Sequence, residues 1–299
     1  MSASTGADHL PGPMVAQRLD EAGVLLLTLN RPERANAWCE ELELDYYAAI
    51  DRAAEDSWVR VVVLCGAGRH FCPGMDIELI RQITAGTRVY MSGRRPQTML
   101  RDLPKPVIAA VGGACAGIGF VQALMADIRF TAPDARWSTA FGRIGLVAED
   151  GVAWRLQRLC GDAVAADLLL SSRTVDGREA AALGLARLVG DEESVVERAL
   201  AYARDMAACS PSSLALIKRQ LTHDADATLG QSRQLAVELL AVAKSRPDYA
   251  EAVAARLERR PANFAGLSAG SVDRIVPARP GSSQDETAGS LIDQLEIKR

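Results

Sequence analysis

Apolar residues recur along the chain in two patterns, as short continuous runs and as longer segments with apolar residues at helical spacing. The short runs end at glycine, asparagine or proline, which favours strands, although a short apolar run does not by itself exclude a helix. We expect strands over residues 24–29, 59–65, 106–111 and 129–131, and one more within 183–189. We expect helices over residues 40–54, 120–126 and 152–159, and a helix with its following connection over 76–90. This alternation predicts an α/β fold with a parallel sheet covered on both faces.

The two ends of the chain differ in composition from its centre. Residues 1–13 are small, polar and proline-bearing, and we expect them to be disordered. Residues 14–195 hold the α/β pattern. Residues 196–267 look almost wholly helical, with apolar residues at helical spacing over 212–221 and 229–243. Residues 268–299 are rich in serine, glycine, proline and charged residues, and we expect a flexible tail there.

Charge and cysteine usage exclude several classes of protein. The formal net charge is −4 and the pI is about 5.6, so the chain has no overall attraction to nucleic acid or to an anionic membrane. No apolar stretch approaches the roughly 20 residues of a membrane span, and no secretory signal is evident. The six cysteines lack Cys-x-x-Cys spacing, and the three histidines form no zinc-binding pattern. We therefore expect a cytoplasmic protein with reduced thiols, no metal, and neither a nucleic-acid nor a membrane partner.

A glycine-rich turn connects the apolar run at 106–111 to the helix expected at 120–126. Gly117 and Gly119 lie at this turn, where glycine permits positive φ and lets a ligand approach the backbone closely. The start of the next helix adds unpaired N–H groups and the positive end of the helix dipole. The turn can hold a phosphate or an oxygen that gains charge during a reaction, or it can be a packing turn with no ligand. It lacks the Walker Gly-Lys-Ser/Thr and the third glycine of the dinucleotide fingerprint.

Two further segments change the interpretation of this turn. Residues 70–77 (HFCPGMDI) follow an apolar strand, and residues 144–151 (IGLVAEDG) precede a helix. Together with the turn, they resemble the crotonase family, also called the enoyl-CoA hydratase/isomerase superfamily. The resemblance spans residues 15–267, and its most specific parts are 105–111 (KPVIAAV) and the Phe-Cys-x-Gly-x-Asp turn. It implies a spiral of ββα units, with C-terminal helices that support trimerisation.

The same resemblance implies an oxyanion site and a coenzyme A site. The two backbone N–H groups that stabilise an enolate-like thioester oxygen fall at Met75 and Ile118. Coenzyme A is then part of the substrate, and no tightly bound cofactor is expected. The residues at positions that resemble the coenzyme A site of the family are Arg34, Ala35, Gly74, Asp76, Gly117, Lys218 and Phe264.

The acid–base groups depart from the family pattern. Hydratases of the family place two glutamates at positions that are Val121 and Phe141 here, which argues against ordinary two-glutamate hydration. The following loop offers Glu149, at the position of an aspartate in dienoyl-CoA isomerases and dehalogenases, and Asp150, which matches an aspartate of carbon–carbon bond hydrolases. Either carboxylate can instead cap the helix that begins near Gly151. We expect Glu149 to carry the proton and Asp150 to be the cap or the alternative base.

The resemblance therefore predicts an acyl-CoA enzyme that forms a thioester enolate, either an enoyl-CoA isomerase or a single-carboxylate hydratase. A catalytically silent acyl-CoA-binding paralogue is the main alternative, because both family glutamates are absent. A thioester hydrolase or dehalogenase is a third, disfavoured by the lack of a histidine near the site that could activate water. The family resemblance and the apolar periodicity of 212–243 predict a homotrimer or a homohexamer.

Overall fold

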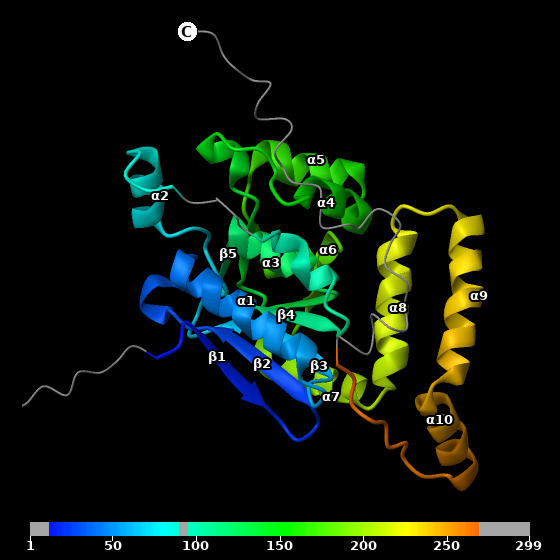
Figure 1. Ribbon diagram of the computed structural model, residues 1–299. Coiled ribbons are helices and arrows are strands. Elements are labelled where there is room, and N and C mark those ends of the chain that lie inside the picture. Colours follow the sequence, from blue (N-terminus) through cyan, green and yellow to red (C-terminus); the bar gives the residue numbers. More distant parts are fainter. Residues whose placement is uncertain (1–11, 90–94, 269–299) are drawn as a thin grey trace, which may run out of the picture.

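The computed structural model describes residues 12–89 and 95–268. Nearly all of the expected flexible tail, 268–299, and of the expected disordered N-terminus, 1–13, lies outside the described residues. Within the described residues the chain is a mixed α/β structure, as the sequence predicts (Figure 1).

The main sheet has six strands in the order β1-β2-β3-β4-β6-β9. β1 pairs with β2 in antiparallel fashion, and every other neighbouring pair is parallel. The predicted parallel sheet is therefore confirmed, and the antiparallel edge strand β1 is the addition to it. The strands are β1 (Val15–Leu19), β2 (Val24–Leu29), β3 (Val61–Gly66), β4 (Val107–Val111), β6 (Ile128–Thr131) and β9 (Arg187–Leu188).

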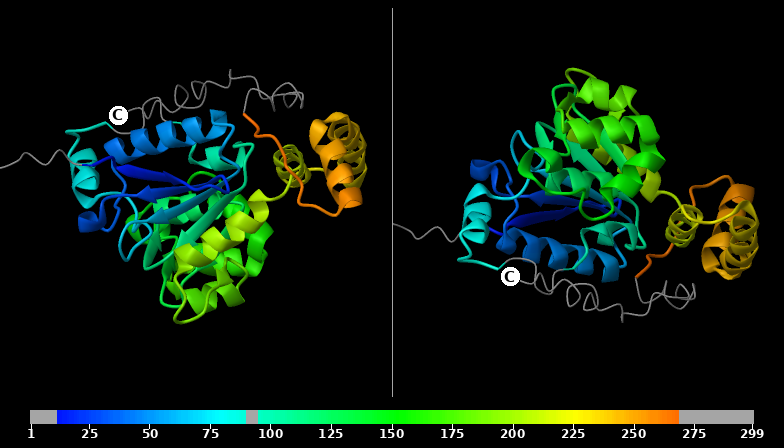
Figure 2. Two further views of the ribbon diagram at one scale, coloured as in Figure 1. Left: turned by 90° about the horizontal axis from the view of Figure 1, so that it is seen from below. Right: turned by 90° about the horizontal axis from the view of Figure 1, so that it is seen from above.

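Helices cover both faces of this sheet (Figure 2). In β3, Val62 and Leu64 face a core shared with α1 (Glu40–Glu55) and α3 (Ile118–Met125). Val61 and Val63 face the opposite core, which is closed by α7 (Val195–Ala207). Burial on both faces explains the unbroken apolar sequence of this strand. Although α7 lies largely within the predicted C-terminal helical region, it packs on the sheet.

A second, three-stranded sheet carries the remaining part of the α/β body. It comprises β5 (Ala114–Ala116), β7 (Arg136–Ser138) and β8 (Val175–Asp176). Each of β4 and β6 continues after a short turn into a strand of this sheet and then into a helical segment, which gives successive ββα units as the family resemblance implies. The other helices of the body are α2 (Ile77–Thr84), α4 (Val152–Cys160), α5 (Asp162–Ser171) and α6 (Gly177–Ala182), with short 3-10 turns η1 (Pro32–Arg34), η2 (Gln97–Arg101) and η3 (Phe141–Ile144).

Three helices stand beside the body at the C-terminal end of the described chain (Figure 1). They are α8 (Pro211–Asp224), α9 (Leu229–Ser245) and α10 (Pro247–Glu258). Ser210 caps α8, and Thr228 and Gln231 form a capping box that starts α9. Large apolar side chains remain exposed on α9 and α10, namely Leu229, Val237, Leu240, Tyr249, Val253 and Leu257.

Candidate active site

Two glycine turns meet at the N-terminus of α3. Gly74 has φ +120° and Gly117 has φ +50°, backbone conformations that favour glycine. A Cβ added to Gly117 would lie 3.6 Å from the Gly74 Cα, so the two turns lie side by side with room for little more than a methyl group between them. Each glycine directly precedes one of the proposed oxyanion residues, Met75 or Ile118.

The N–H group of Met75 points away from Trp38, with which Met75 forms an isolated parallel β-bridge. The Trp38 N–H donates to the Gly74 carbonyl oxygen at 2.8 Å, and the Trp38 carbonyl oxygen accepts from the Asp76 N–H at 2.8 Å. These two hydrogen bonds bracket Met75, so the N–H of Met75 faces the opposite side. Ile118 is the first residue of α3, where a helix N–H has no intrahelical acceptor. Among the described residues, neither N–H has a protein acceptor, so both can bind an oxygen that carries negative charge.

Residues 71 and 72 fix the turn at Gly74 against β5. The Cys72 N–H donates to Ala114 at 2.9 Å, and the Cys72 carbonyl oxygen accepts from Ala116 at 3.0 Å. Gly119 lies directly over this carbonyl, since a Cβ at position 119 would come within 2.2 Å of the Cys72 oxygen. The Gly-Ile-Gly sequence therefore combines one glycine needed for its φ angle with one needed for close packing.

Two arginines hold the opposite end of α3. The Arg129 guanidinium donates to the carbonyl oxygens of Ala126 at 2.7 Å and Leu124 at 3.4 Å, and Arg155 donates to Leu124 at 3.4 Å. Burial, together with the neighbouring positive charges, lowers the pKa of each arginine to about 10, so both remain charged at neutral pH. Cations at a helix C-terminus stabilise it, and here they anchor the helix that presents the Ile118 N–H.

The loop between η3 and α4 presents two partly buried carboxylates, Glu149 and Asp150. Asp150 has φ +49°, and its Oδ1 accepts from the Gln97 N–H at 3.4 Å. The N-cap of α4 is Gly151, so neither Glu149 nor Asp150 occupies the N-cap position. The expectation that one of them is the N-cap residue is therefore wrong. Asp150 reaches the start of η2 instead, and Glu149 contributes its carbonyl oxygen to a turn with Val152 at 3.0 Å.

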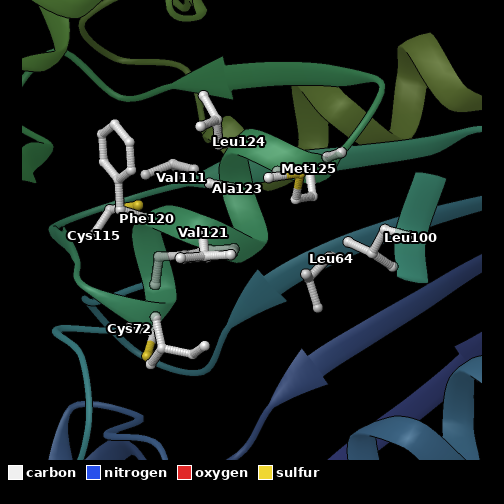
Figure 3. Close-up of a cluster of buried hydrophobic side chains, with 14 of the residues drawn as sticks. Leu64, Cys72, Leu100, Val111, Cys115, Phe120, Val121, Ala123, Leu124 and Met125 are labelled. Atoms are coloured by element: carbon white, nitrogen blue, oxygen red, sulfur yellow. The ribbon is translucent and has the colours of Figure 1, made fainter. Parts of the chain in front are cut away.

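The two positions at which the resemblance places the hydratase glutamates are buried and apolar in this chain. Val121 is fully buried and Phe141 is nearly so. Figure 3 shows Val121 among buried apolar side chains that include Leu64 and Cys72. Burial raises the pKa of the Cys72 thiol to about 12, so this thiol stays protonated and is not a nucleophile.

Part of the predicted coenzyme A site lies beside the Met75 turn. Arg34 is exposed in η1, and Ala35 ends that turn with φ +54°. The Asn36 side chain ties this loop to the next one by donating to the carbonyl oxygens of Ala67 at 2.9 Å and His70 at 2.6 Å. The loop bearing Arg34 is thereby held close to the Gly74 turn.

The Asp76 carboxylate is used within the protein. One oxygen caps α2 by accepting from the Glu78 N–H at 2.9 Å, and the other pairs with Arg31 at 3.0 Å. Asp76 therefore shapes the turn at Met75, and any contribution to ligand binding passes through that turn.

Lys218 and Phe264 make their hydrogen bonds with parts of the chain other than the glycine turns. The Lys218 ammonium is buried and donates to the carbonyl oxygens of Leu100 at 2.8 Å and Lys105 at 3.0 Å, and to Asp127 at 2.7 Å. All three of its donors are thus used inside the protein. Phe264 is buried at the return of the chain from α10, where its carbonyl oxygen accepts from Arg60 at 2.5 Å. The assignment of Lys218 as a coenzyme A contact is corrected here to a structural role.

A buried polar network beside α3 was not identified from the sequence. It joins Glu43 and Tyr47 of α1 to Gln97 of η2 and Gln122 of α3. One signal was available, since Glu43 and Tyr47 are four residues apart on one helix face. No sequence signal links them to Gln97 or Gln122.

Residues 12–89 and 95–268 contain no group of three or more His, Cys, Asp or Glu side chains that could hold a metal ion. No helix in that part of the chain is both long and apolar enough to cross a bilayer.

Comparison with known proteins gives a consistent result. Residues 20–267 match the family model described as enoyl-CoA hydratase/isomerase. The chain is 34% identical over 252 residues to the 1,2-epoxyphenylacetyl-CoA isomerase of Escherichia coli K12, a match that covers 82% of this chain and 96% of the isomerase. It is 35% identical over 262 residues to a Mycobacterium tuberculosis H37Rv protein named probable enoyl-CoA hydratase EchA12, covering 84% of this chain and 89% of that protein.

Solved structures show the same likeness. The crystal structure of enoyl-CoA hydratase EchA1 from Mycobacterium marinum superposes with a TM-score of 0.77 at 29% identity, over 85% of this chain and all of the other. Enoyl-CoA hydratase EchA12_1 from the same organism is 46% identical, with a TM-score of 0.60, over 70% of this chain and 96% of the other.

Proposed function

The chain belongs to the enoyl-CoA hydratase/isomerase family, and we propose that it stabilises the enolate of an acyl-CoA thioester between the N–H groups of Met75 and Ile118. Relatives are named as an isomerase of an acyl-CoA and as enoyl-CoA hydratases, so the activity is of the acyl-CoA isomerase or hydratase class. One observation carries the assignment of the site. The turns at Gly74 and Gly117 lie side by side, and each is followed by a backbone donor that lacks a protein acceptor among the described residues.

Two such donors account for a large part of the required stabilisation. Removing one oxyanion donor from an enzyme typically costs about 3–4 kcal/mol in the transition state. The donors here belong to a strand pairing and to a helix start that is anchored at its other end, so little reorganisation is needed when charge develops on the thioester oxygen.

Glu149 is the proposed proton carrier. The positions of the two family glutamates are occupied by Val121 and Phe141, which cannot transfer protons. Glu149 and Asp150 are the acidic residues of the loop that leads into α4, and Asp150 accepts a hydrogen bond from Gln97. With one carboxylate, moving a double bond by removing and returning a proton is the simpler reaction, and single-carboxylate hydration is the other form of the proposal. Slow hydration of crotonyl-CoA beside rapid α-proton exchange would favour the isomerase form.

The substrate supplies coenzyme A itself. Arg34 is exposed on the loop tied to the Gly74 turn, where it can meet a phosphate, and Ala35 presents backbone groups from the same loop. We propose a cytoplasmic location, since all six cysteines are free thiols. We also propose a homotrimer or a dimer of trimers, in which the exposed apolar side chains of α9 and α10 are covered by another copy.

A silent acyl-CoA-binding protein is the second candidate, favoured by the same apolar residues at positions 121 and 141. The test is exchange of the α-protons of butyryl-CoA in deuterated water, followed by mass spectrometry. The enzyme incorporates deuterium, and a binding protein does not. Release of free coenzyme A would indicate thioester hydrolysis instead.

Ile118→Pro tests the oxyanion site itself. Proline is favoured at the first position of a helix and lacks the N–H, so this substitution removes one donor where the backbone tolerates it. Ile118→Ala keeps the N–H and measures the cost of losing the side chain. Exchange by the proline variant should be lower than by the alanine variant by roughly 10²–10³-fold. Equal rates in the two variants would contradict the assignment.

A further inference from the structure

Glu43 is a buried carboxylate that the proposed chemistry does not use. It lies on α1 and is 4% exposed. Its oxygens accept hydrogen bonds from Trp38 Nε1 at 3.0 Å, the Tyr47 hydroxyl at 2.5 Å and Gln97 Nε2 at 3.1 Å. Removing a carboxylate from water costs several kcal/mol unless hydrogen-bond donors of this kind replace the water. Its three donors come from different parts of the chain, before α1, within α1 and in η2.

The Trp38 contact leads to the first oxyanion donor. The side chain of Trp38 is held by Glu43, and its main chain makes the two hydrogen bonds that bracket Met75. The orientation of the Met75 peptide therefore depends on the position of Trp38, which the Glu43 carboxylate fixes from the other side of the residue.

The Gln97 contact leads to the second donor and to the carboxylate loop. The Gln97 Oε1 accepts from Gln122, which lies one helical turn after Ile118 in α3. The other end of the Gln122 amide accepts from the Tyr46 hydroxyl at 2.7 Å, so this side chain is held at both ends. The Gln97 main-chain N–H donates to Asp150, the neighbour of Glu149.

We infer that Glu43 is a positioning residue, whose carboxylate holds the Met75 turn, helix α3 and the Glu149–Asp150 loop in place relative to one another. Glu43 does not touch the substrate. It reaches the three parts of the site through Trp38 and Gln97, by contacts between residues up to 54 positions apart. This inference rests on the proposed function for its catalytic consequence, and on the hydrogen bonds alone for its structural part.

Glu43→Gln is the direct test, because it keeps the size of the side chain and removes its charge. The new amide oxygen can still accept from Trp38 Nε1, and the Tyr47 hydroxyl can accept from the new N–H and donate to the Arg95 carbonyl oxygen 3.0 Å away. Gln97 Nε2, itself a donor, then loses its acceptor on residue 43. Asp248→Asn is the matched control. Asp248 is also a buried carboxylate, on α10, and it accepts from the Ser212 N–H at 3.3 Å and the Ser212 hydroxyl at 2.7 Å, away from the site.

Two measurements on the full chain test the positioning role of Glu43. Amide hydrogen exchange of the free protein should rise in Glu43→Gln over segments 72–80, 114–125 and 145–152 together, whereas Asp248→Asn should change only α8 to α10. Deuterium exchange into butyryl-CoA at saturation should fall at least tenfold in Glu43→Gln, approaching the roughly 10²-fold that a misplacement of about 1 Å can cost. The affinity of Glu43→Gln for coenzyme A should stay within about threefold of the parent's. A general loss of stability does not lower turnover while leaving binding unchanged in this way.

The outcomes separate this inference from the proposed function. Unchanged amide exchange in the three segments, or a fall in turnover no larger than in Asp248→Asn, overturns the role of Glu43. If the parent protein does not exchange the α-protons of butyryl-CoA, the proposed function fails. The concerted change in amide hydrogen exchange alone then decides whether Glu43 holds the three segments together.

Discussion

Gly119 packs directly against Cys72, with room for no more than a hydrogen atom between the glycine Cα and the Cys72 carbonyl oxygen. A Cβ at position 119 would lie 2.2 Å from that oxygen. The contact joins the helix that carries one proposed oxyanion donor to the segment that carries the other. The geometry of the site thus depends on a packing contact as much as on hydrogen bonds.

Gly119→Ala should therefore destabilise the protein and displace α3. Overpacking of this kind costs about 1–3 kcal/mol, and each kcal/mol lowers the melting temperature of a chain of this size by about 2–4 °C. Gly190→Ala is the control, because its Cβ would meet nothing closer than 3.8 Å and the position has ordinary backbone angles. Differential scanning calorimetry of both variants measures the effect, and equal melting temperatures would show that α3 can move away at no cost.

The cysteines should differ sharply in reactivity. Cys209 is exposed and Cys160 is partly buried, while the other four are buried, and burial raises the pKa of Cys72 to about 12. Iodoacetamide at pH 8 should label Cys209 rapidly and Cys160 slowly, and the buried thiols only after unfolding. Peptide mass spectrometry over time gives the order. Rapid labelling of Cys72 in the native protein would mean that the segment at the Gly74 turn opens readily.

Lys105 should make stability depend on pH. Its ammonium is buried and donates to the carbonyl oxygens of Ala53 and Asp56, each at 2.6 Å. Burial lowers the pKa of Lys105 from 10.5 to about 8. Between these two pH values the unfolded chain binds the proton and the folded chain does not, so stability rises with pH there, and the burial penalty is fully present below about pH 8.

The measurement is the free energy of unfolding in urea, compared between the parent and Lys105→Met from pH 7 to 10. The difference should shift in favour of the parent above pH 8, because the variant has no group to titrate at that position. Lys244→Met changes an exposed lysine of α9 and serves as the control. A difference that is flat across this range would show that Lys105 is better solvated than its burial indicates.

Assembly should depend on α9 and α10. Val237, Leu240 and Val253 are exposed there, and a charged residue on an apolar interface is costly to bury. Light scattering at micromolar concentration should give the mass of a trimer or hexamer for the parent, and a lower mass for Val237→Asp. Leu170→Asp is the control, because it places the same charge at an exposed apolar position on α5 and should leave the mass unchanged. A monomeric parent would contradict the proposed assembly.

The sequence predicts those strands and turns whose signal lies within a few consecutive residues. Residues 61–65 form a strand that is apolar on both faces. The turns are marked in the sequence by glycines, because only glycine tolerates their backbone angles or their close packing. β1 was missed because Gln17 and Arg18 make it a polar edge strand, and β5, β7 and β8 because they are too short to show a period.

The site was predicted unevenly for a related reason. Met75 and Ile118 are implied by the family resemblance, whose motifs at these two turns are local in sequence. Glu43 and Lys218 depend on partners far along the chain: Glu43 pairs with Gln97, 54 residues away, and Lys218 with Leu100, 118 residues away. A lysine on a helix looks the same in sequence whether its ammonium binds a phosphate or three buried oxygens, and only the packed structure separates the two.

Glu149 is the residue on which the proposed reaction depends most directly. Glu149→Gln keeps the size of the side chain and removes its basicity, and loss of a general acid–base group costs roughly 10²–10⁴ in rate. Because Gly151 and not Glu149 is the N-cap residue of α4, we expect the variant to fold and to bind coenzyme A esters while losing α-proton exchange. Asp150→Asn keeps an acceptor for the Gln97 N–H and should lower exchange by less than Glu149→Gln does. If Glu149→Gln exchanges α-protons as fast as the parent while Asp150→Asn does not, the proton carrier is Asp150, and the hydrogen bond from Gln97 then positions the reacting group itself.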